Sequence, residues 1–206
     1  MRYTKKQSAF SLVETLVAIT ILLIVIVGPM TIVSSAARST SFASEQVTAF
    51  FLAQEGAELV EKVRNDLLLQ FFVNANPGND PWADFTSTAG GGIFRTCYTT
   101  INPNGCAFHI SPTGNLSTPI SCSALSDCNV FIDTTTEDLR SRYIHSTSPS
   151  SSLTPTQFTR QIILEQVPGN PNEVKVTSKV TWRSGSVRED QVVNVETRLF
   201  NLYESN

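Results

Sequence analysis

Hydrophobic and polar positions divide the chain into an uninterrupted apolar run, a segment with helical periodicity and a segment with strand periodicity. Residues 15–37 are 23 residues without a charged side chain. As a helix they would measure about 35 Å, enough to cross the roughly 30 Å hydrocarbon core of a bilayer. Gly28 and Pro29 lie inside the run and are expected to weaken or kink the helix, because proline lacks a backbone donor. The run predicts a membrane-spanning helix.

The next segment, residues 38–69, contains no proline and has apolar residues at spacings of three, four and seven. These residues are Phe42, Ala49, Ala53, Ala57, Val60, Val63 and Leu67. Such spacings place side chains on one stripe of an α-helix, so we predict an amphipathic helix that packs on its own domain. Glu58 and Lys62, four positions apart, are expected to form an ion pair on its surface.

Strand periodicity is clearest between residues 158 and 200. Within 173–185, one face carries Val174, Val176, Ser178, Val180 and Trp182, and the intervening residues are polar. Segments 158–167 and 191–200 are also strand-like, and short turn sequences connect all three. They predict an antiparallel β-meander with one face free to pack on the helix.

The region between helix and meander is rich in turn-forming residues. Residues 94–110 are expected to form a β-hairpin around the sequence Asn-Pro-Asn-Gly. The polar, low-complexity stretch 146–156 reads as an exposed connector.

All four cysteines lie in this middle region. Cys97 and Cys106 flank the predicted turn, and Cys122 and Cys128 enclose five residues. Four cysteines allow three connectivities, and we predict the two local pairs, each closing a short loop that stabilises by about 2–3 kcal/mol in the entropic model. A zinc site is the rival interpretation, but these spacings fit zinc motifs poorly.

Charge is unevenly distributed and orients the apolar run. Arg2, Lys5 and Lys6 precede it without an acid, whereas beyond Ala37 there are 17 acidic and 12 basic residues, a balance of −5. By the positive-inside rule the basic head stays cytoplasmic and the rest is exported, where cysteines can be oxidised. The negative exported part gives no electrostatic reason to expect nucleic acid as a partner.

Glu14 is a carboxylate near the start of the apolar stretch. A charge in hydrocarbon costs about 2.5–3.5 kcal/mol on insertion scales. A simple signal-anchor helix would be more favourable without it. So would a cleavable secretory signal, for which small residues at 34–36 resemble a cleavage site. Neither alternative explains Glu14.

The N-terminal residues resemble those of a type IV prepilin. A short basic leader and a small residue precede Phe-Ser-Leu-Val-Glu at 10–14 and an apolar helix. The resemblance implies that prepilin peptidase cuts between Ala9 and Phe10 and that Phe10 becomes an N-methylated N-terminus. It also implies that Glu14 serves assembly by pairing with the amine of Phe10, its own or a neighbouring subunit's, which offsets the desolvation of both charges. Glycine usually precedes the cut, and Ala9 departs from this pattern.

The resemblance and the periodicity together predict an α+β, pilin-like fold, in which a long N-terminal helix packs on a C-terminal antiparallel β-meander. The predicted segments are a cytoplasmic leader (1–9), a transmembrane and assembly helix (10–37), an amphipathic helix (38–72), a loop-rich region with two disulfides (73–157) and the meander (158–206). We expect the amphipathic helix also to contact neighbouring subunits through its N-terminal part.

Catalysis finds no support in the sequence. His109 and His145 lie in no nucleophile or metal motif, and we interpret each as a polar loop or strand residue. Asp127, Asn129 and Asp133 lie close together but lack the glycine and terminal glutamate of a calcium loop, so calcium remains an option only. We expect no enzymatic activity, no cofactor and no metal site.

The function implied by the resemblance is a structural subunit of a type IV pilus or pilus-like filament. A minor subunit is expected, because the exported part is larger and more loop-rich than a filament shaft needs. The implied partners are prepilin peptidase, other pilin subunits, the inner-membrane assembly platform and the cytoplasmic membrane. The chain would cross that membrane once, with its C-terminus outside, and later join a cell-surface or periplasmic filament.

Three alternatives remain open from the sequence. The first is a pseudopilin of a type II secretion system, and the second is a tip adhesin or DNA-uptake subunit that binds through the middle loops. The third is a secreted protein released by signal peptidase.

Overall fold

The structure is a computed structural model with two compact units, Met1–Ser44 and Glu45–Asn206. It describes residues 11–74, 80–111, 114–135, 143–146, 150–185 and 189–202. One helix, α1 (Leu12–Asn74), supplies residues to both units. Its assignment is unbroken at Pro29, so the expected weakening at Gly28 and Pro29 does not interrupt the helix.

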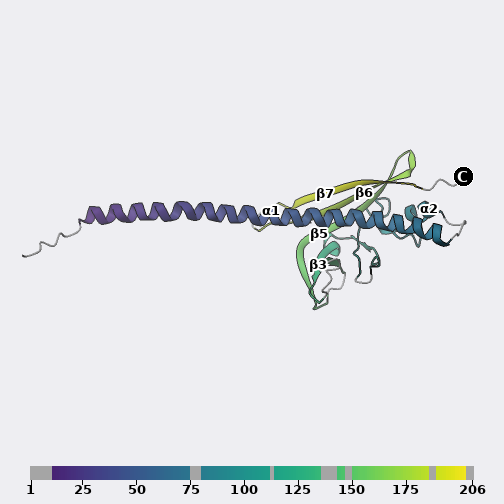
Figure 1. Cartoon of the computed structure of the whole chain (residues 1–206), viewed down its shortest axis with the longest axis horizontal. Coiled ribbons are helices and arrows are strands. Elements are labelled where there is room, and N and C mark those ends of the chain that lie inside the picture. Colours follow the sequence, from purple (N-terminus) through teal and green to yellow (C-terminus); the bar gives the residue numbers. More distant parts are fainter. Residues whose placement is uncertain are drawn as a thin grey trace, which may run out of the picture. The chain divides into compact units, whose positions relative to one another are not determined.

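The second unit is built on one antiparallel sheet, to which the described residues contribute seven strands. The strands are β1 (Cys106–Ala107), β2 (Ile120–Ser121), β3 (Asn129–Asp133), β4 (Tyr143–His145), β5 (Leu153–Val167), β6 (Asn170–Trp182) and β7 (Gln191–Phe200). β6 pairs with β5 and β7, which confirms the predicted meander (Figure 1). The helical turns α2 (Pro81–Thr86) and η1 (Arg95–Cys97) lie between α1 and β1 along the chain, and η2 (Leu125–Cys128) lies between β2 and β3.

The long strand β5 organises the rest of the sheet. It begins at Leu153, five residues before the predicted start, and its edge opposite β6 pairs with β3 and then with β1. β4 pairs with β3 and β2 pairs with β1. The region expected to be loop-rich therefore adds four short strands to the meander.

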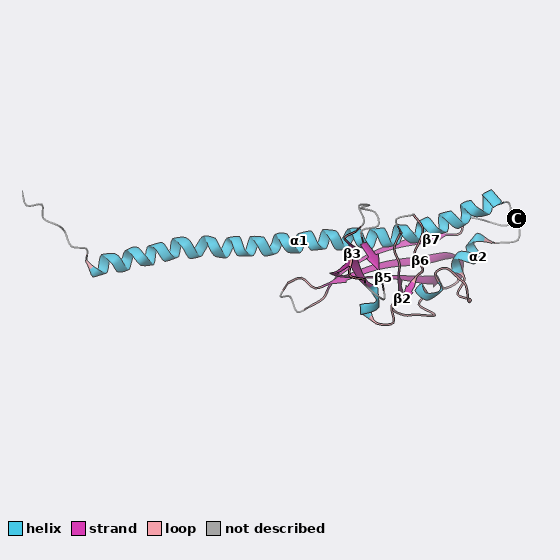
Figure 2. Ribbon diagram, turned by 90° about the horizontal axis from the view of Figure 1, so that it is seen from below, coloured by secondary structure: helices cyan, strands magenta, loops and turns pink. Residues whose placement is uncertain are grey.

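Within this unit, residues 45–74 of α1 lie along one face of the sheet (Figure 2). The predicted stripe is confirmed from Ala49 onward, since its members from Ala49 to Val63 are at most 8% exposed and Leu67 is partly buried, whereas Phe42 lies in the first unit. The face of β6 that was predicted to be apolar points at the helix, with Val174, Val176, Ser178 and Val180 all fully buried. The fold class is α+β and pilin-like, as expected.

Gly56 allows the helix to approach the sheet closely. A Cβ built on Gly56 would overlap the hydroxyl oxygen of Ser178 on β6 and would lie 3.3 Å from side-chain carbons of Arg160 and Ile162 on β5. Glycine costs about 1 kcal/mol relative to alanine inside a helix. The close contact with the sheet therefore explains why the smallest residue occupies this position.

The predicted hairpin over residues 94–110 is wrong, although its turn forms. The amide of Gly105 donates to the carbonyl of Asn102 at 3.0 Å, and Gly105 has a φ of +70°. The first arm, however, starts as the turn η1 and then runs beside β5, where the amide of Thr99 donates to the carbonyl of Leu164 at 3.1 Å. The arm pairs with a distant strand because β5 offers a free edge next to a buried core.

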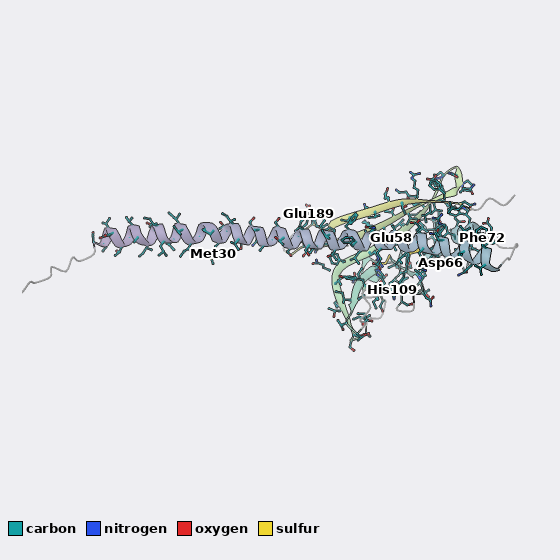
Figure 3. The ribbon with its side chains drawn as sticks, in the orientation of Figure 1. Met30, Glu58, Asp66, Phe72, His109 and Glu189 are labelled. Carbon is teal, nitrogen blue, oxygen red and sulfur yellow. A yellow bond between two sulfur atoms is a disulfide. The ribbon has the colours of Figure 1, made fainter. Side chains whose placement is uncertain are left out.

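The expected ion pair between Glu58 and Lys62 is replaced by a pair one turn further along. Lys62 Nζ lies 2.5 Å from Asp66, and Glu58 accepts a hydrogen bond from Gln54 at 2.7 Å (Figure 3). Lys62 and Asp66 are still four residues apart and exposed, so the exchange changes stability by only a few tenths of a kcal/mol.

Candidate assembly site

Glu14 lies in the first turn of α1 and is the only charged residue between Leu12 and Ala37. The first amides of a helix have no partner within the helix, and the macrodipole places partial positive charge there. A carboxylate is therefore favourable at this position within the helix itself. That local effect amounts to at most about 1 kcal/mol at an exposed site and does not offset the cost of burying the charge in hydrocarbon.

The other polar side chains between Leu12 and Val33 are three threonines, and each bonds to its own helix. Thr15, Thr20 and Thr31 donate to the carbonyls three residues earlier at 2.9, 2.8 and 2.7 Å. A hydroxyl satisfied in this way can enter an apolar environment at little cost. Glu14 differs from the threonines because its charge needs a partner outside its own backbone.

The surface around this carboxylate is apolar and uncovered. Large hydrophobic side chains from Leu12 to Val33 are 47–80% exposed. Among the described residues, α1 is the one helix long and apolar enough to cross a membrane, with a mean hydropathy of 2.8 over its most apolar 18 residues. An uncovered apolar surface of this size needs lipid or other apolar helices around it.

The two residues predicted to flank the cleavage site, Ala9 and Phe10, lie outside the described residues. Pairing of Glu14 with the amine of Phe10 therefore stays a prediction. The small residues 34–36, which resembled a secretory cleavage site, lie inside α1.

A second concentration of polar groups is buried in the Glu45–Asn206 unit, around Arg160 of β5. This side chain is fully buried. Its guanidinium donates hydrogen bonds to the carbonyl of Leu52 (3.1 Å), the carboxylate of Glu55 (2.7 Å), the carbonyl of Phe108 (2.8 Å) and Nε2 of His145 (3.2 Å). Arg160 thereby connects α1, β4 and the segment after β1 to the centre of the sheet.

The hydrogen bonds around Arg160 determine the protonation of both histidines. Because His145 Nε2 accepts from Arg160, the ring carries its proton on Nδ1, which donates to the carbonyl of Asn129 at 3.0 Å. His109 Nδ1 accepts from the amide of His145 at 3.3 Å. Burial and the charge of Arg160 lower the pKa of His109, and burial, Arg160 and His109 together lower the pKa of His145 well below its ordinary value.

The Arg160 cluster was missed in reading the sequence, although a signal for it exists. Phe158, Arg160, Ile162 and Leu164 alternate along β5, so the arginine occupies a position on the apolar face. An arginine at such a position predicts a buried ion pair. His145 is a strand residue as interpreted, but it is only 3% exposed.

The four cysteines form the two local pairs expected from their spacing. Cys97 and Cys106 are joined with their Cα atoms 4.6 Å apart, and Cys122 and Cys128 with theirs 5.5 Å apart. All four cysteines are fully buried. The first pair lies in the main core and the second packs on Ala107.

We expect non-reducing peptide mapping to recover Cys97–Cys106 and Cys122–Cys128. Reduction should increase amide hydrogen exchange in residues 94–133 more than in the meander, because the meander is stabilised by packing and strand pairing. Free thiols in the native protein, or a Cys106–Cys122 cross-link, would contradict this pairing.

The residues considered for calcium accept hydrogen bonds from other protein groups. Asp127 accepts from the amide of Ala124 at 2.8 Å, Asn129 from the hydroxyl of Thr159 at 3.1 Å, and Asp133 from Thr135. Within the part of the chain that the structure describes, no three histidine, cysteine, aspartate or glutamate side chains are grouped as metal ligands.

Comparison with protein-family models matches residues 4–28 to the prokaryotic N-terminal methylation motif, which is the type IV pilin signature. No curated protein and no solved structure matches the chain at a significant level. The matched residues include Lys5 and Lys6 of the leader, Phe10, Glu14 and the first half of the apolar run. The chain thus combines the type IV pilin signature with a pilin-like α+β fold, and the motif indicates a structural protein that is processed by prepilin peptidase and assembled with other pilins.

Proposed function

We propose that this protein is a minor structural subunit of a type IV pilus or pilus-like filament. The observation that carries the proposal is the methylation motif at residues 4–28, placed at the start of a helix whose first half exposes large apolar side chains. Before assembly this surface would lie in the cytoplasmic membrane, with the Glu45–Asn206 unit outside. After assembly, the apolar helices of neighbouring subunits would take the place of lipid.

Glu14 is the assembly residue in this proposal. Removal of residues 1–9 leaves Phe10 with a cationic amine four residues before the carboxylate of Glu14. Two opposite charges at short range in a low-dielectric bundle attract each other strongly enough to offset much of their desolvation. The three threonines of the apolar run already hydrogen-bond to the backbone of their own helix. The charges of Phe10 and Glu14 are therefore the main polar groups of the anchor that need a partner.

The partners that we propose are those needed for cleavage of the leader and for assembly of the filament. Prepilin peptidase would cut the leader, the inner-membrane assembly platform would receive the mature chain, and other pilin subunits would pack around its helix. A pseudopilin of a type II secretion system would pass through equivalent steps. Copurification of the chain with one assembly machine or the other identifies which filament it enters.

Processing provides the direct test of this proposal. The mature chain is expected to begin at Phe10 and to carry one methyl group on its amine, because the leader and the Phe10 motif match those of prepilins. Intact-mass measurement and N-terminal sequencing of membrane fractions check both features. A mature chain that begins at Ala37 would instead support a secretory signal and would remove the anchor.

A further inference from the structure

The strand β4 is attached to the rest of the fold through His145. Its three residues pair with β3 along one edge, with Val130 opposite His145 and Ile132 opposite Tyr143. In the described sheet β4 is the terminal strand on that side. A strand of this length has few ladder hydrogen bonds, so contacts of its side chains decide whether it stays in place.

His145 uses both ring nitrogens and its amide for that attachment. Nδ1 donates to the carbonyl of Asn129 on β3, Nε2 accepts from Arg160 on β5, and the amide donates to His109. The contact with Arg160 requires a neutral ring. A proton on Nε2 would turn the acceptor into a donor and would place two cations 3.2 Å apart.

The charges that face His145 come from three elements. Arg160 approaches from β5 and His109 from the segment after β1, while Glu55 of α1 binds the far side of the guanidinium at 2.7 Å. Glu55 is one carboxylate and balances the single charge of Arg160. A second cation at His145, which is only 3% exposed, would be buried without a counter-charge, and this is costly.

The residues next to the two histidines form one wall of a groove beside α1. Ile110 follows His109, Tyr143 lies two residues before His145, and both face Phe51 and Leu59 of the helix. The groove has a volume of about 670 Å³. Any movement of β4 and of the segment around Ile110 changes the width of this groove.

We propose that His145 is a proton-sensitive latch: the neutral ring holds β4 and the Ile110 segment against α1, and protonation releases both and opens the groove. The β5–β6–β7 meander stays in place, since it contains no histidine and its strands are joined by long continuous ladders. Acid therefore exposes the apolar side of α1 without unfolding the domain.

The sign and size of the effect follow from proton linkage. The pKa of His145 is lowered in the closed state and returns to about 6.5 when the latch opens. The closed state has its full stability above about pH 6.5 and loses stability as the pH falls below this value, because only the open state binds the proton. Proton uptake by His145 alone is expected to favour opening about 30-fold at pH 5.0 relative to pH 7.5.

Hydrogen exchange of the full-length chain in detergent micelles tests the latch. Between pH 7.5 and 5.0, after correction for intrinsic exchange rates, protection of residues 108–111 and 143–146 should fall about 30-fold or more in the wild type. Protection of residues 173–182 should not change. His145→Gln, whose side-chain oxygen can still accept from Arg160 but does not titrate, should remove the part of the pH dependence that comes from His145, whereas His109→Gln should retain that part.

Several outcomes would overturn the proposal. The first two are an unchanged protection of residues 143–146 in the wild type and an equal fall in the meander. The other two are a pH dependence that is undiminished in His145→Gln and one that disappears in His109→Gln. If His145→Gln does not fold, the imidazole resonances of the wild type decide the question. Titration of His145 with a pKa of 6.5 or higher, with no change in its neighbours, would also overturn it.

Discussion

Glu14→Leu should still insert into the membrane and lose its leader, yet be depleted from filaments by a factor of about one hundred or more. Cleavage before Phe10 does not involve the carboxylate, and leucine inserts more easily than glutamate. In the filament, however, the amine of Phe10 would remain as a buried charge without its partner. Such a loss costs about 3–5 kcal/mol where the pair is well buried.

The measurement is the amount of variant that cofractionates with sheared filaments, relative to its amount in the membrane. Glu14→Asp should be intermediate, because the shorter side chain keeps the charge but reaches less far. Glu61→Leu is the matched control, since it makes the same replacement on the same helix at an exposed residue whose side chain is 49% accessible. Incorporation of Glu14→Leu at the wild-type level would refute the assembly role.

Arg160→Met is expected to destabilise the Glu45–Asn206 unit by about 3–5 kcal/mol. The replacement removes a buried cation and leaves the carbonyls of Leu52 and Phe108 and the ring of His145 without their donor. It also leaves Glu55 without its counter-charge. Methionine fills most of the volume, so the expected loss comes from unpaired polar groups and not from a cavity.

Urea unfolding of the full-length chain in micelles, followed by the fluorescence of the buried Trp82 and Trp182, measures this loss. Arg183→Met is the matched control. That arginine pairs with Asp190 at 2.7 Å but its side chain is 61% exposed, and exposed pairs contribute about 0–1 kcal/mol. Equal destabilisation by the two replacements would show that the Arg160 network contributes no more to the free energy of unfolding than the exposed pair of Arg183 and Asp190 does.

The sequence by itself determined the features that depend on local periodicity. The stripe from Ala49 to Val63 and the alternation along β6 are visible within short windows, because helices and strands repeat every 3.6 and 2 residues. The methylation motif is also a contiguous stretch, at residues 4–28. The two cysteine pairs follow from short separations along the chain, which make local closure the simplest arrangement.

The tertiary structure alone decided the features that depend on contacts between distant segments. Thr99 pairs with β5 and not with its sequence neighbours, because a free strand edge beside a core offers more burial than an isolated hairpin does. The environment of Arg160 depends on Glu55, which lies 105 residues away. No local window contains both partners, so the burial of Arg160, the neutral state of His145 and the groove beside α1 emerge only when helix and sheet have packed together.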